Sequence, residues 1–269
     1  MPTSWSRRST STSNPSKSTT GAVHSAGLQY EDMTNFKLDA RLSAAASLCG
    51  SGTVADIGTD HAYLPIYLVE SGTPRALASD INEGPCDSAR KNVAAHGLAD
   101  KITVACRPGL DGIEAFAPDN IFICGMGGEL IADILAASDY PRAARCRLIL
   151  QPMTMHAALR RYLAGAGFAI TDERVVREGS KHYQLIAAKY DGIVRSFTAA
   201  EYALGAENLA RAAKHPTEAD ISWLTFVRTR ASARVCGRAS AGIESDEQRA
   251  DRALLAVIEP ILQGVSSHA

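Results

Sequence analysis

The sequence predicts an α/β protein built on a parallel sheet, because short β-rich runs alternate with helical patterns from residue 37 to about 190. Several of these runs end in glycine turns, as at Asp56-Ile57-Gly58 and Gly125-Met126-Gly127-Gly128. Beyond Gly192 the composition changes to helix formers. These three observations predict a sheet domain followed by a small helical domain.

The first half of the predicted sheet follows from apolar runs and helix signals. A helix is expected over 38–48, and the apolar run at 53–57 predicts the first strand. Pro65 opens the next helix, about 63–71, because proline is favoured in a first helical turn. Residues 76–80 predict the second strand, which ends in an acid.

The middle of the chain continues the alternation. A helix is expected from Pro85 to about His96, closed by Gly97, since glycine favours the backbone geometry that ends helices. The third strand is predicted at 102–106 and the fourth at 121–124, with a helix following over 129–137.

The second half of the sheet has a different connection. The fifth strand is expected at 148–150, followed by a helix over 156–164 that is closed by Gly165 or Gly167. Two further runs, 168–176 and 183–189, have no helix between them and predict an antiparallel edge. The tail carries helical periodicity over 198–213, 217–238 and 246–262, which predicts an antiparallel helix pair.

Composition excludes several classes of protein. The 269 residues hold 28 basic and 29 acidic side chains, so no global field marks a nucleic-acid protein. The six cysteines form no Cys-x-x-Cys pair, which predicts a reducing, cytoplasmic compartment without a metal site. No apolar run approaches the roughly 18 residues of a membrane span.

Residues 1–30 differ from the remainder. Twelve of the first 20 are Ser or Thr, and no acid precedes Glu31, so we expect a disordered extension. An organellar transit peptide and a dispensable extension both fit this composition. The predicted domains are therefore 1–30, a cofactor-binding domain over 31–192 and a helical domain over 193–269.

The stretch from Asp56 to Pro65 carries the strongest functional signal. A strand, a tight glycine turn and a helix start place a nucleotide-like ligand against helix-terminal N–H groups. The turn lacks the Gly-x-Gly-x-x-Gly pattern of dinucleotide-binding proteins. Acids on both sides of Gly58, followed by His61, suit a cationic ligand such as S-adenosylmethionine. An ordinary strand-to-helix turn is the alternative.

Ligands of open α/β sheets bind at the carboxyl ends of the strands. Asp80 follows Asp56 by 24 positions, close to the spacing at which an acid accepts hydrogen bonds from both ribose hydroxyls. The next residue, Ile81, suits an adenine face. Helix capping by Asp80 and core packing by Ile81 are the alternatives. The three glycines of residues 125–128 allow the backbone to approach a ligand closely.

Four blocks in order resemble one family. They are Asp-Ile-Gly-Thr-Asp-His-Ala-Tyr-Leu-Pro (56–65), Gly-Met-Gly-Gly (125–128), Leu-Ile-Leu-Gln-Pro (148–152) and Glu178…Lys181…Tyr183. The chain over about 36–190 resembles the bacterial tRNA adenine-N1 methyltransferases, and its tail is similar to their coiled-coil domain. The resemblance implies a class I methyltransferase fold with a seven-stranded sheet, and S-adenosylmethionine as cofactor.

The resemblance also implies the residues of the site. Asp56, Gly58, Thr59, Asp60 and His61 would surround the methionine end of the cofactor. Asp80 and Ile81 would hold its adenosine, and Gly125 and Met126 would contact it from the fourth strand. Asp60 and His61 are the catalytic candidates.

The turn after the third strand departs from the family. The usual Gly-Asp-Gly-Leu is replaced by Arg-Pro-Gly-Leu-Asp-Gly at 107–112. Either Gly109 and Leu110 align and Pro108 replaces the acid, or Asp111 aligns with a shift. Gly109, Leu110 and Asp111 are therefore the candidates for the adenine contact.

A tRNA substrate requires basic surface. Residues 140–190 hold nine Lys or Arg against three acids, and no acid lies between 221 and 243. The residues predicted to contact tRNA are Arg142, Arg145, Arg160, Arg161, Arg230, Arg234 and Arg238. Solvated helix faces are the alternative.

The predicted function is methyl transfer from S-adenosylmethionine to N1 of a tRNA adenine, by a monomer or weak dimer. A methyltransferase for a small molecule or protein remains an alternative. So does a non-catalytic, cofactor-binding RNA scaffold. A nicotinamide-dependent reductase is disfavoured because the first turn lacks the further glycines.

Overall fold

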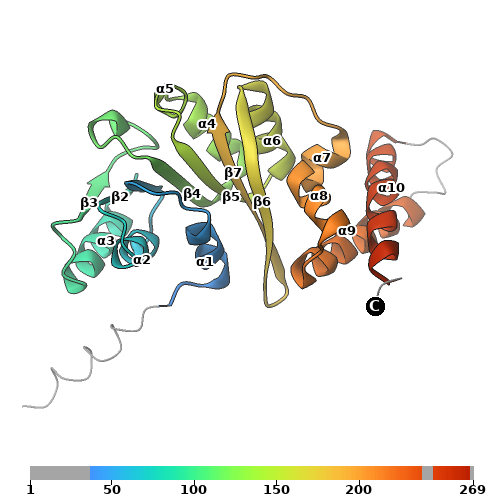
Figure 1. Ribbon diagram of the computed structural model, residues 1–269, viewed down its shortest axis with the longest axis horizontal. Coiled ribbons are helices and arrows are strands. Elements are labelled where there is room, and N and C mark those ends of the chain that lie inside the picture. Colours follow the sequence, from blue (N-terminus) through green and yellow to red (C-terminus); the bar gives the residue numbers. More distant parts are fainter. Residues whose placement is uncertain (1–36, 238–244, 267–269) are drawn as a thin grey trace, which may run out of the picture. The chain divides into compact units, whose positions relative to one another are not determined.

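A seven-stranded sheet with the order β3-β2-β1-β4-β5-β7-β6 forms the centre of the protein (Figure 1). The computed structural model describes residues 37–237 and 245–266, so the predicted extension 1–30 and Arg238 lie outside the described residues. The strands are β1 (Val54–Ile57), β2 (Ala76–Asp80), β3 (Ile102–Cys106), β4 (Asn120–Gly127), β5 (Arg147–Thr154), β6 (Phe168–Glu178) and β7 (Lys181–Tyr190).

Strands β1 to β5 pair in parallel, whereas β7 pairs antiparallel with both β5 and β6. The predicted seven-stranded sheet with a terminal antiparallel hairpin is therefore confirmed. The strand order reverses at β1, since β2 lies on one side of it and β4 on the other.

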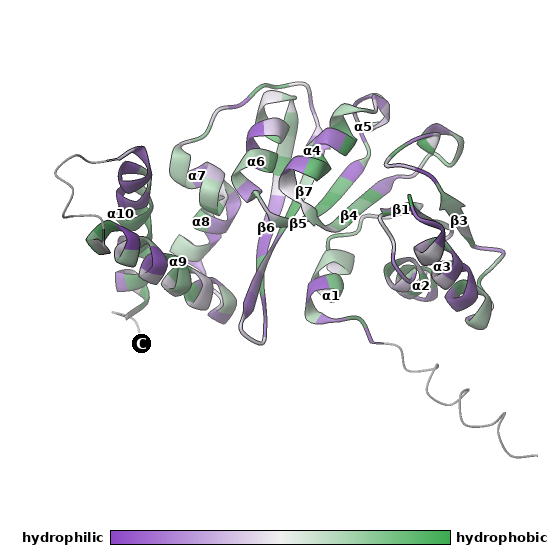
Figure 2. Ribbon diagram, turned by 180° about the vertical axis from the view of Figure 1, so that it is seen from behind, coloured by the Kyte–Doolittle hydropathy of each residue, from purple (hydrophilic) through white to green (hydrophobic). Residues whose placement is uncertain are grey.

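The helices of the sheet domain are α1 (Ala40–Ser47), α2 (Tyr63–Glu70), α3 (Glu83–Ala95), α4 (Gly128–Ala136), α5 (Tyr140–Ala143) and α6 (His156–Gly165). Helices α4 and α6 cover one face of the sheet, and α1, α2 and α3 contact the strands from the other (Figure 1). Side chains of β4 and β5 such as Ile121, Ile123 and Leu148 are fully buried against α4 and α6. Burial on both faces explains the continuous apolar runs of these strands, which are green in Figure 2.

The sequence analysis missed two short elements, α5 and a 3₁₀ turn at Ile113–Ala115. It also predicted one helix over 198–213, where the structure has α7 (Ala199–Leu204) and α8 (Ala206–Lys214). Gly205 separates them with a φ of +90°, and its Cα faces the carboxylate of Glu173 so closely that no Cβ would fit. The break therefore lets the start of α8 approach a buried carboxylate.

The tail continues with α9 (Glu218–Gly237) and α10 (Asp246–Ser266), which pack side by side (Figure 1). Trp223 and Leu224 of α9 and Ile258 of α10 form a second apolar cluster, which Val175 of β6 joins. The predicted helix pair is therefore present and packs on the edge of the sheet. The domain boundary at 192/193 stays a prediction.

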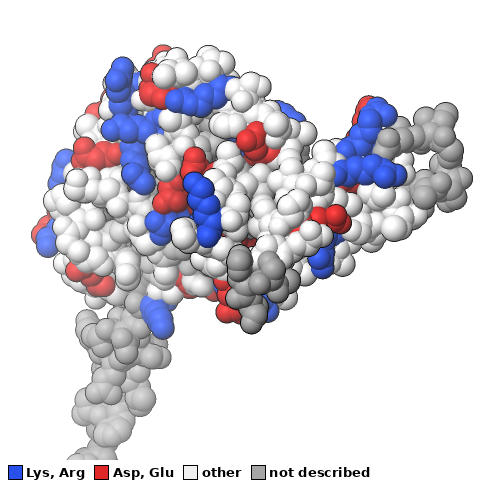
Figure 3. Space-filling model, turned by 45° about the vertical axis from the view of Figure 1, so that its right-hand side comes forward, with Lys and Arg blue, Asp and Glu red and all other residues white. Residues whose placement is uncertain are grey.

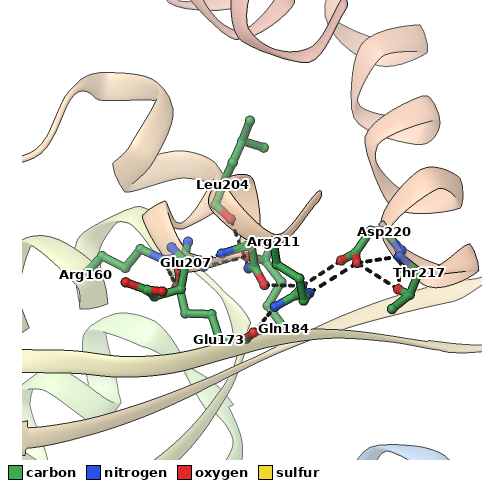
Figure 4. Close-up of polar contacts among 9 residues, drawn as sticks. Arg160, Glu173, Gln184, Leu204, Glu207, Arg211, Thr217 and Asp220 are labelled. Atoms are coloured by element: carbon green, nitrogen blue, oxygen red, sulfur yellow. Dashed lines mark hydrogen bonds and ion pairs between the residues drawn. The ribbon is translucent and has the colours of Figure 1, made fainter. Parts of the chain in front are cut away.

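A buried polar network fixes this helical part to the sheet (Figure 4). Arg160 of α6 is 1% exposed and donates to Oε1 of Glu173 on β6 at 2.6 Å and to Gln184 on β7 at 2.7 Å. The other carboxylate oxygen of Glu173 accepts from the backbone N–H of Glu207 at 3.1 Å. Arg211 of α8 pairs with Asp220 of α9 at 2.6 Å.

This network corrects one prediction about RNA. Arg160 was expected on a basic surface, but its guanidinium is enclosed and also donates to the carbonyls of Tyr202 and Ala203. Its charge is neutralised by Glu173, so Arg160 is unavailable to RNA phosphates. A charge count along the sequence does not distinguish a buried arginine from an exposed one.

Candidate functional site

The first turn of the sheet lies at the strand reversal, where open α/β sheets bind ligands. β1 ends at Ile57, and the N–H groups of Gly58 and Thr59 both donate to the carbonyl of Ser79 on β2. Thr59 Oγ1 then accepts from the N–H of Ala62 at 3.1 Å, just before α2 begins. The turn is therefore held rigidly against β2.

A cavity of about 420 Å³ opens at the carboxyl ends of β1 and β4. This is within the size range of small-molecule sites. The lining residues are Asp39, Arg41, Leu42, Asp56, Gly58, Thr59, Asp60, His61, Tyr63, Leu64, Cys124 and Gly125. Six of the predicted cofactor residues are thus brought together: Asp56, Gly58, Thr59, Asp60, His61 and Gly125.

Two glycines shape the cavity differently. Gly58 has a φ of +79°, and the Cε of Met126 lies where a Cβ would stand, so the methionine covers the turn. Gly125 has a φ of +83°, and no atom lies within 4 Å of its Cβ position. Its backbone therefore presents an open surface to the cavity.

The sequence analysis missed Arg41, which belongs to the first turn of α1. Its Nη1 donates to Oε1 of Gln151 at 3.0 Å, and the same oxygen accepts from the N–H of Gly125 at 3.1 Å. The guanidinium also lies over the ring of Tyr183, 5.9 Å from its centroid. Nothing in the spacing along the chain links Arg41 to β5 and β7. The N-cap residue Asp39 was the available signal for where the helix begins.

Two residues of the sequence block Glu178…Lys181…Tyr183 contact this helix. Glu178 Oε1 accepts from the N–H of Ala40 at 3.3 Å, and Tyr183 contacts Arg41 from β7. Residues of the hairpin therefore seat α1 against the cavity.

Asp56 is a buried carboxylate in the cavity wall. Burial raises its pKa to about 6, the neighbouring Asp80 also raises it, and the Thr59 hydrogen bond and the charge of Arg41 act in the opposite direction. Burial also raises the pKa of the Cys124 thiol, which disfavours a nucleophilic thiolate. The wall thus offers carboxylate charge and no activated nucleophile at this cysteine.

Asp60 and His61 stand at the mouth of the cavity. His61 Nε2 lies 3.3 Å from Asp60 Oδ2, and its ring stacks on Tyr63 with centroids 5.1 Å apart. The Asp60 side chain is 76% exposed and the His61 side chain 41%. The pair is therefore accessible to a second substrate.

The residues predicted to contact adenosine, Asp80 and Ile81, lie at the next strand end. Asp80 ends β2, and its Oδ1 accepts from the N–H of Asn82 at 2.8 Å. Ile81 is 65% exposed, an uncommon state for an isoleucine beside a sheet. Neither residue lines the cavity, and the ribose and adenine contacts stay predictions.

The turn after β3 does not contribute to the cavity wall. Leu110 is buried in the core, Gly109 faces Ile134 of α4 and Asp111 is exposed, and none of the three lines the cavity. Their adenine contact stays a prediction, and any such contact would come from outside the cavity wall described here.

The charged groups that line the cavity are complementary to S-adenosylmethionine. Its wall places three carboxylates, Asp39, Asp56 and Asp60, beside one guanidinium, Arg41, which pairs with Asp39 at 3.4 Å. A zwitterionic ligand with an additional positive charge is complementary to such a set. The open face of Gly125 allows close contact with a ligand backbone.

The remaining predicted RNA residues have mixed surroundings. Arg142 donates to the Tyr162 hydroxyl at 3.1 Å, Arg161 lies over Tyr202, and Arg234 pairs with Asp251 at 2.5 Å. Arg145 is exposed with a φ of +50°. On the face drawn in Figure 3, acidic side chains lie among the basic ones, and a group of basic side chains lies on the helical part. RNA contact by these residues stays a prediction.

Among the described residues, no helix is long and apolar enough to cross a membrane. The same part of the chain holds no group of three or more His, Cys, Asp or Glu side chains placed to bind a metal ion.

Comparison with known proteins agrees with this geometry. Residues 38–186 match the family model described as "Methyltransferase domain". The tRNA (adenine(22)-N(1))-methyltransferase of Bacillus subtilis is 39% identical over 170 residues, 60% of this chain and 71% of the relative.

Two solved structures extend the comparison to the cofactor. A Streptococcus pneumoniae protein in complex with S-adenosyl-L-methionine is 30% identical, with a TM-score of 0.71 over 84% of this chain and all of that one. TrmK of M. capricolum in complex with S-adenosyl-homocysteine is 27% identical, with a TM-score of 0.69 over 84% of this chain and 98% of that one. The resemblance seen in the four sequence blocks is confirmed, and the chain belongs to the tRNA (adenine-N1)-methyltransferase family.

Proposed function

We propose that this protein transfers a methyl group from S-adenosylmethionine to N1 of an adenine in tRNA. The observation that carries the proposal is the cavity at the β1/β4 strand reversal, in which Asp56, Asp60 and Arg41 surround one space. Family membership supplies the reaction class, and the cavity supplies a place for its cofactor.

The residues that would hold the cofactor come from the ends of β1 and β2 and from the first turn of α1. Asp56 and Asp60 face its cationic groups, Arg41 its carboxylate, and Asp80 and Ile81 its adenosine. Bound S-adenosylmethionine supplies an electrophilic methyl group on a sulfonium. Burial of Asp56 and the rigid Gly58 turn keep the site organised before the ligand arrives.

The reaction needs little assistance from a general base. Adenine N1 carries a lone pair and no proton at neutral pH, and the methylated base becomes a cation. A carboxylate fixed near that ring therefore stabilises the positive charge as it develops. Asp60 is the exposed carboxylate at the mouth of the cavity, and His61 at 3.3 Å orients it. The adenine must leave its stack to reach this point.

For the substrate, the B. subtilis relative is named for adenine 22 of tRNA. We propose the same adenine here, and a cytoplasmic location where newly transcribed tRNA is available. The helical part that follows β7 would hold the tRNA while the sheet domain holds the cofactor.

The test is methyl transfer from radiolabelled S-adenosylmethionine to an unmodified tRNA transcript with adenine at position 22, followed by nucleoside analysis. The matched control is the same transcript with guanine at that position. We expect label in 1-methyladenosine from the first transcript and none from the second.

Other outcomes would redirect the proposal. Label at a different adenine would keep the reaction and overturn the position. Cofactor binding without label in tRNA, combined with transfer to a nucleoside or peptide, would favour the small-molecule or protein methyltransferase. Binding of both ligands without any transfer would favour the non-catalytic scaffold.

A further inference from the structure

The outer half of the β6–β7 hairpin extends past the edge where the cofactor cavity opens. The β5–β7 pairing ends at Leu150 and Ile186, so residues 181–185 of β7 pair with β6 and not with β5. β7 runs antiparallel to β5, and its first residues therefore lie toward the carboxyl end of β5. This hairpin segment is largely hydrophilic in Figure 2.

Side chains of neighbouring residues in this segment point to opposite faces of the hairpin, as the two-residue period of a strand requires. Tyr183 lies under Arg41, which lines the cofactor cavity. The adjacent His182 instead contacts α9, where its Nε2 lies 2.9 Å from Oγ of Ser222. One short segment thus connects the cavity to the surface of the helical part.

On that second face three side chains form a layered surface, which we call the aromatic platform: His182, Phe226 and Arg230. The rings of His182 and Phe226 have centroids 5.6 Å apart, and the Arg230 guanidinium lies 5.4 Å from the centroid of Phe226. Ser222, Phe226 and Arg230 are spaced four residues apart, so they follow one stripe of α9. The Ser222 hydrogen bond holds the histidine ring in place.

The exposure of Phe226 is not explained by packing. Its neighbours Trp223 and Leu224 are buried in the helical core, whereas Phe226 is 46% exposed. Burial and the charge of Arg177 lower the pKa of His182, so its ring is neutral at neutral pH and well suited to stacking. Part of the Phe226 side chain is therefore presented to solvent, beside His182 and Arg230.

The charged side chains around the platform favour the binding of a polyanion. Arg230 makes no ion pair with a carboxylate within the described residues, and no acid follows Asp220 in α9. Arg177 stands opposite His182 across the hairpin, and Lys181 is exposed at its tip. Glu218 is the exception, 3.9 Å from Arg177 across a groove of about 640 Å³.

We propose that the aromatic platform stacks an unpaired base of the tRNA substrate, while Arg230 contacts the adjoining phosphate. Unstacked bases are bound in this way on aromatic rings and guanidinium planes. The inference rests on the proposed function. It adds a second RNA contact, on the face of the hairpin opposite to the one that contacts Arg41. A second copy of this chain is the competing occupant of an exposed aromatic face.

The test is tRNA binding by full-length variants at position 226. Phe226→Leu keeps an apolar side chain and removes the ring, whereas Phe226→Trp restores a stacking surface. The measurements are the dissociation constant for unmodified tRNA at several salt concentrations, cofactor affinity by calorimetry and molecular mass by light scattering. Phe197→Leu is the matched control, because that ring packs on Tyr202 instead.

We expect Phe226→Leu to weaken tRNA binding by at least about fivefold, with the salt slope unchanged. Phe226→Trp should return the affinity to within about twofold of the native protein. Arg230→Gln should reduce the salt slope by about one, as expected for one lost phosphate contact. Cofactor affinity should be unchanged in every variant.

The platform is overturned if Phe226→Leu binds tRNA like the native protein, even when that protein methylates it normally. It is also overturned if the substitution dissociates a dimer without affecting RNA binding, or if native protein binds no tRNA. Loss of affinity in Phe226→Leu but not in Phe197→Leu supports the platform even where no methyl transfer is found, so the two proposals fail separately.

Discussion

Arg41 Nη1 donates a hydrogen bond of 3.0 Å to Gln151 Oε1, across 110 residues of sequence. The amide oxygen of Gln151 also accepts from the N–H of Gly125 at 3.1 Å, and the whole side chain is buried. One glutamine therefore connects α1, the end of β4 and the end of β5. The geometry of the cavity mouth depends on this connection.

Replacing Arg41 by methionine should weaken the binding of S-adenosylmethionine and S-adenosylhomocysteine by about tenfold. The substitution removes a hydrogen bond to a buried oxygen and the positive charge facing the ligand, a loss of the order of one charged hydrogen bond. Calorimetry with both ligands measures it. Arg174→Met is the matched control, because Arg174 also contacts α1, through Ser47 Oγ at 2.8 Å. Equal losses in both variants would mean that Arg41 only anchors the helix.

Asp56 should make cofactor affinity depend on pH. Its pKa is raised to about 6 by burial, so the ionised form that attracts a cationic ligand is lost as the pH falls through about 6. Affinity should therefore be level above pH 7 and decline below 6. In Asp56→Asn the affinity should be lower throughout and this decline absent. A native profile that is level from pH 5 to 8 would contradict the prediction.

The same carboxyl should affect stability in the opposite sense. Its folded-state pKa lies above the unfolded value, so the ligand-free protein gains stability as the pH falls and loses it as the pH rises from about 4 to about 6. The effect is at most about 3 kcal/mol for one group shifted by about two pH units. Urea unfolding of the native protein and Asp56→Asn at pH 4.5 and 7 measures the difference. Asp56→Asn should lack this part of the pH dependence.

The glycine turns allow a matched pair of substitutions. Gly58 and Gly125 have similar φ values of +79° and +83°, so alanine at either position costs about 1 kcal/mol in backbone strain. Only at Gly58 would the new methyl group meet another side chain, that of Met126. The Cε of Met126 is the end of a flexible side chain that can turn aside, so Gly58→Ala should destabilise only slightly more than Gly125→Ala by chemical denaturation. Adding Met126→Ala to Gly58→Ala should remove the additional loss of stability that the contact with Met126 causes. An unchanged difference in stability would show that backbone strain alone is responsible.

The sequence predicted most of the sheet because most of its strands are short apolar runs followed by glycine, proline or an acid. Five of the first-turn residues predicted to bind the cofactor line one cavity, since they are adjacent in sequence and follow one strand. Contacts between distant segments were not predictable in this way. Arg41 reaches Gln151 and Tyr183 only because α1 packs across the ends of β5 and β7.

The errors have the same origin. Arg160 belongs to a run of basic residues, yet the packing of α6 against β6 and β7 encloses it. Gly205 interrupts a helical pattern because Glu173, 32 positions earlier, occupies the space a Cβ would need. Local periodicity carries no information about such neighbours.

Arg160 should be essential for stability and irrelevant to RNA phosphates. Arg160→Met leaves the carboxylate of Glu173 buried without its cation, which costs about 3–5 kcal/mol. The double variant Arg160→Met with Glu173→Leu should recover part of this loss, because neither charge remains. Chemical denaturation of the native protein, the single variant and the double variant measures this recovery. The salt slope of tRNA binding should be the same in the double variant as in the native protein, whereas a slope reduced by one would restore Arg160 as a phosphate contact.

Asp60 should act on the reaction and much less on cofactor binding. Its side chain is 76% exposed at the cavity mouth, so Asp60→Asn removes charge without creating a cavity or an unpaired buried group. Loss of a carboxylate that stabilises a developing cation should lower the single-turnover rate of tRNA methylation by about 10- to 100-fold. The dissociation constant for S-adenosylmethionine should change by less than about threefold, in keeping with a weak interaction between exposed charges. Asp133→Asn on α4 is the control for an exposed carboxylate outside the cavity. Full activity of Asp60→Asn with unchanged cofactor affinity would exclude this role. The remaining carboxylates of the cavity wall, Asp39 and Asp56, would then be the candidates, and the pH profile expected of Asp56 distinguishes them.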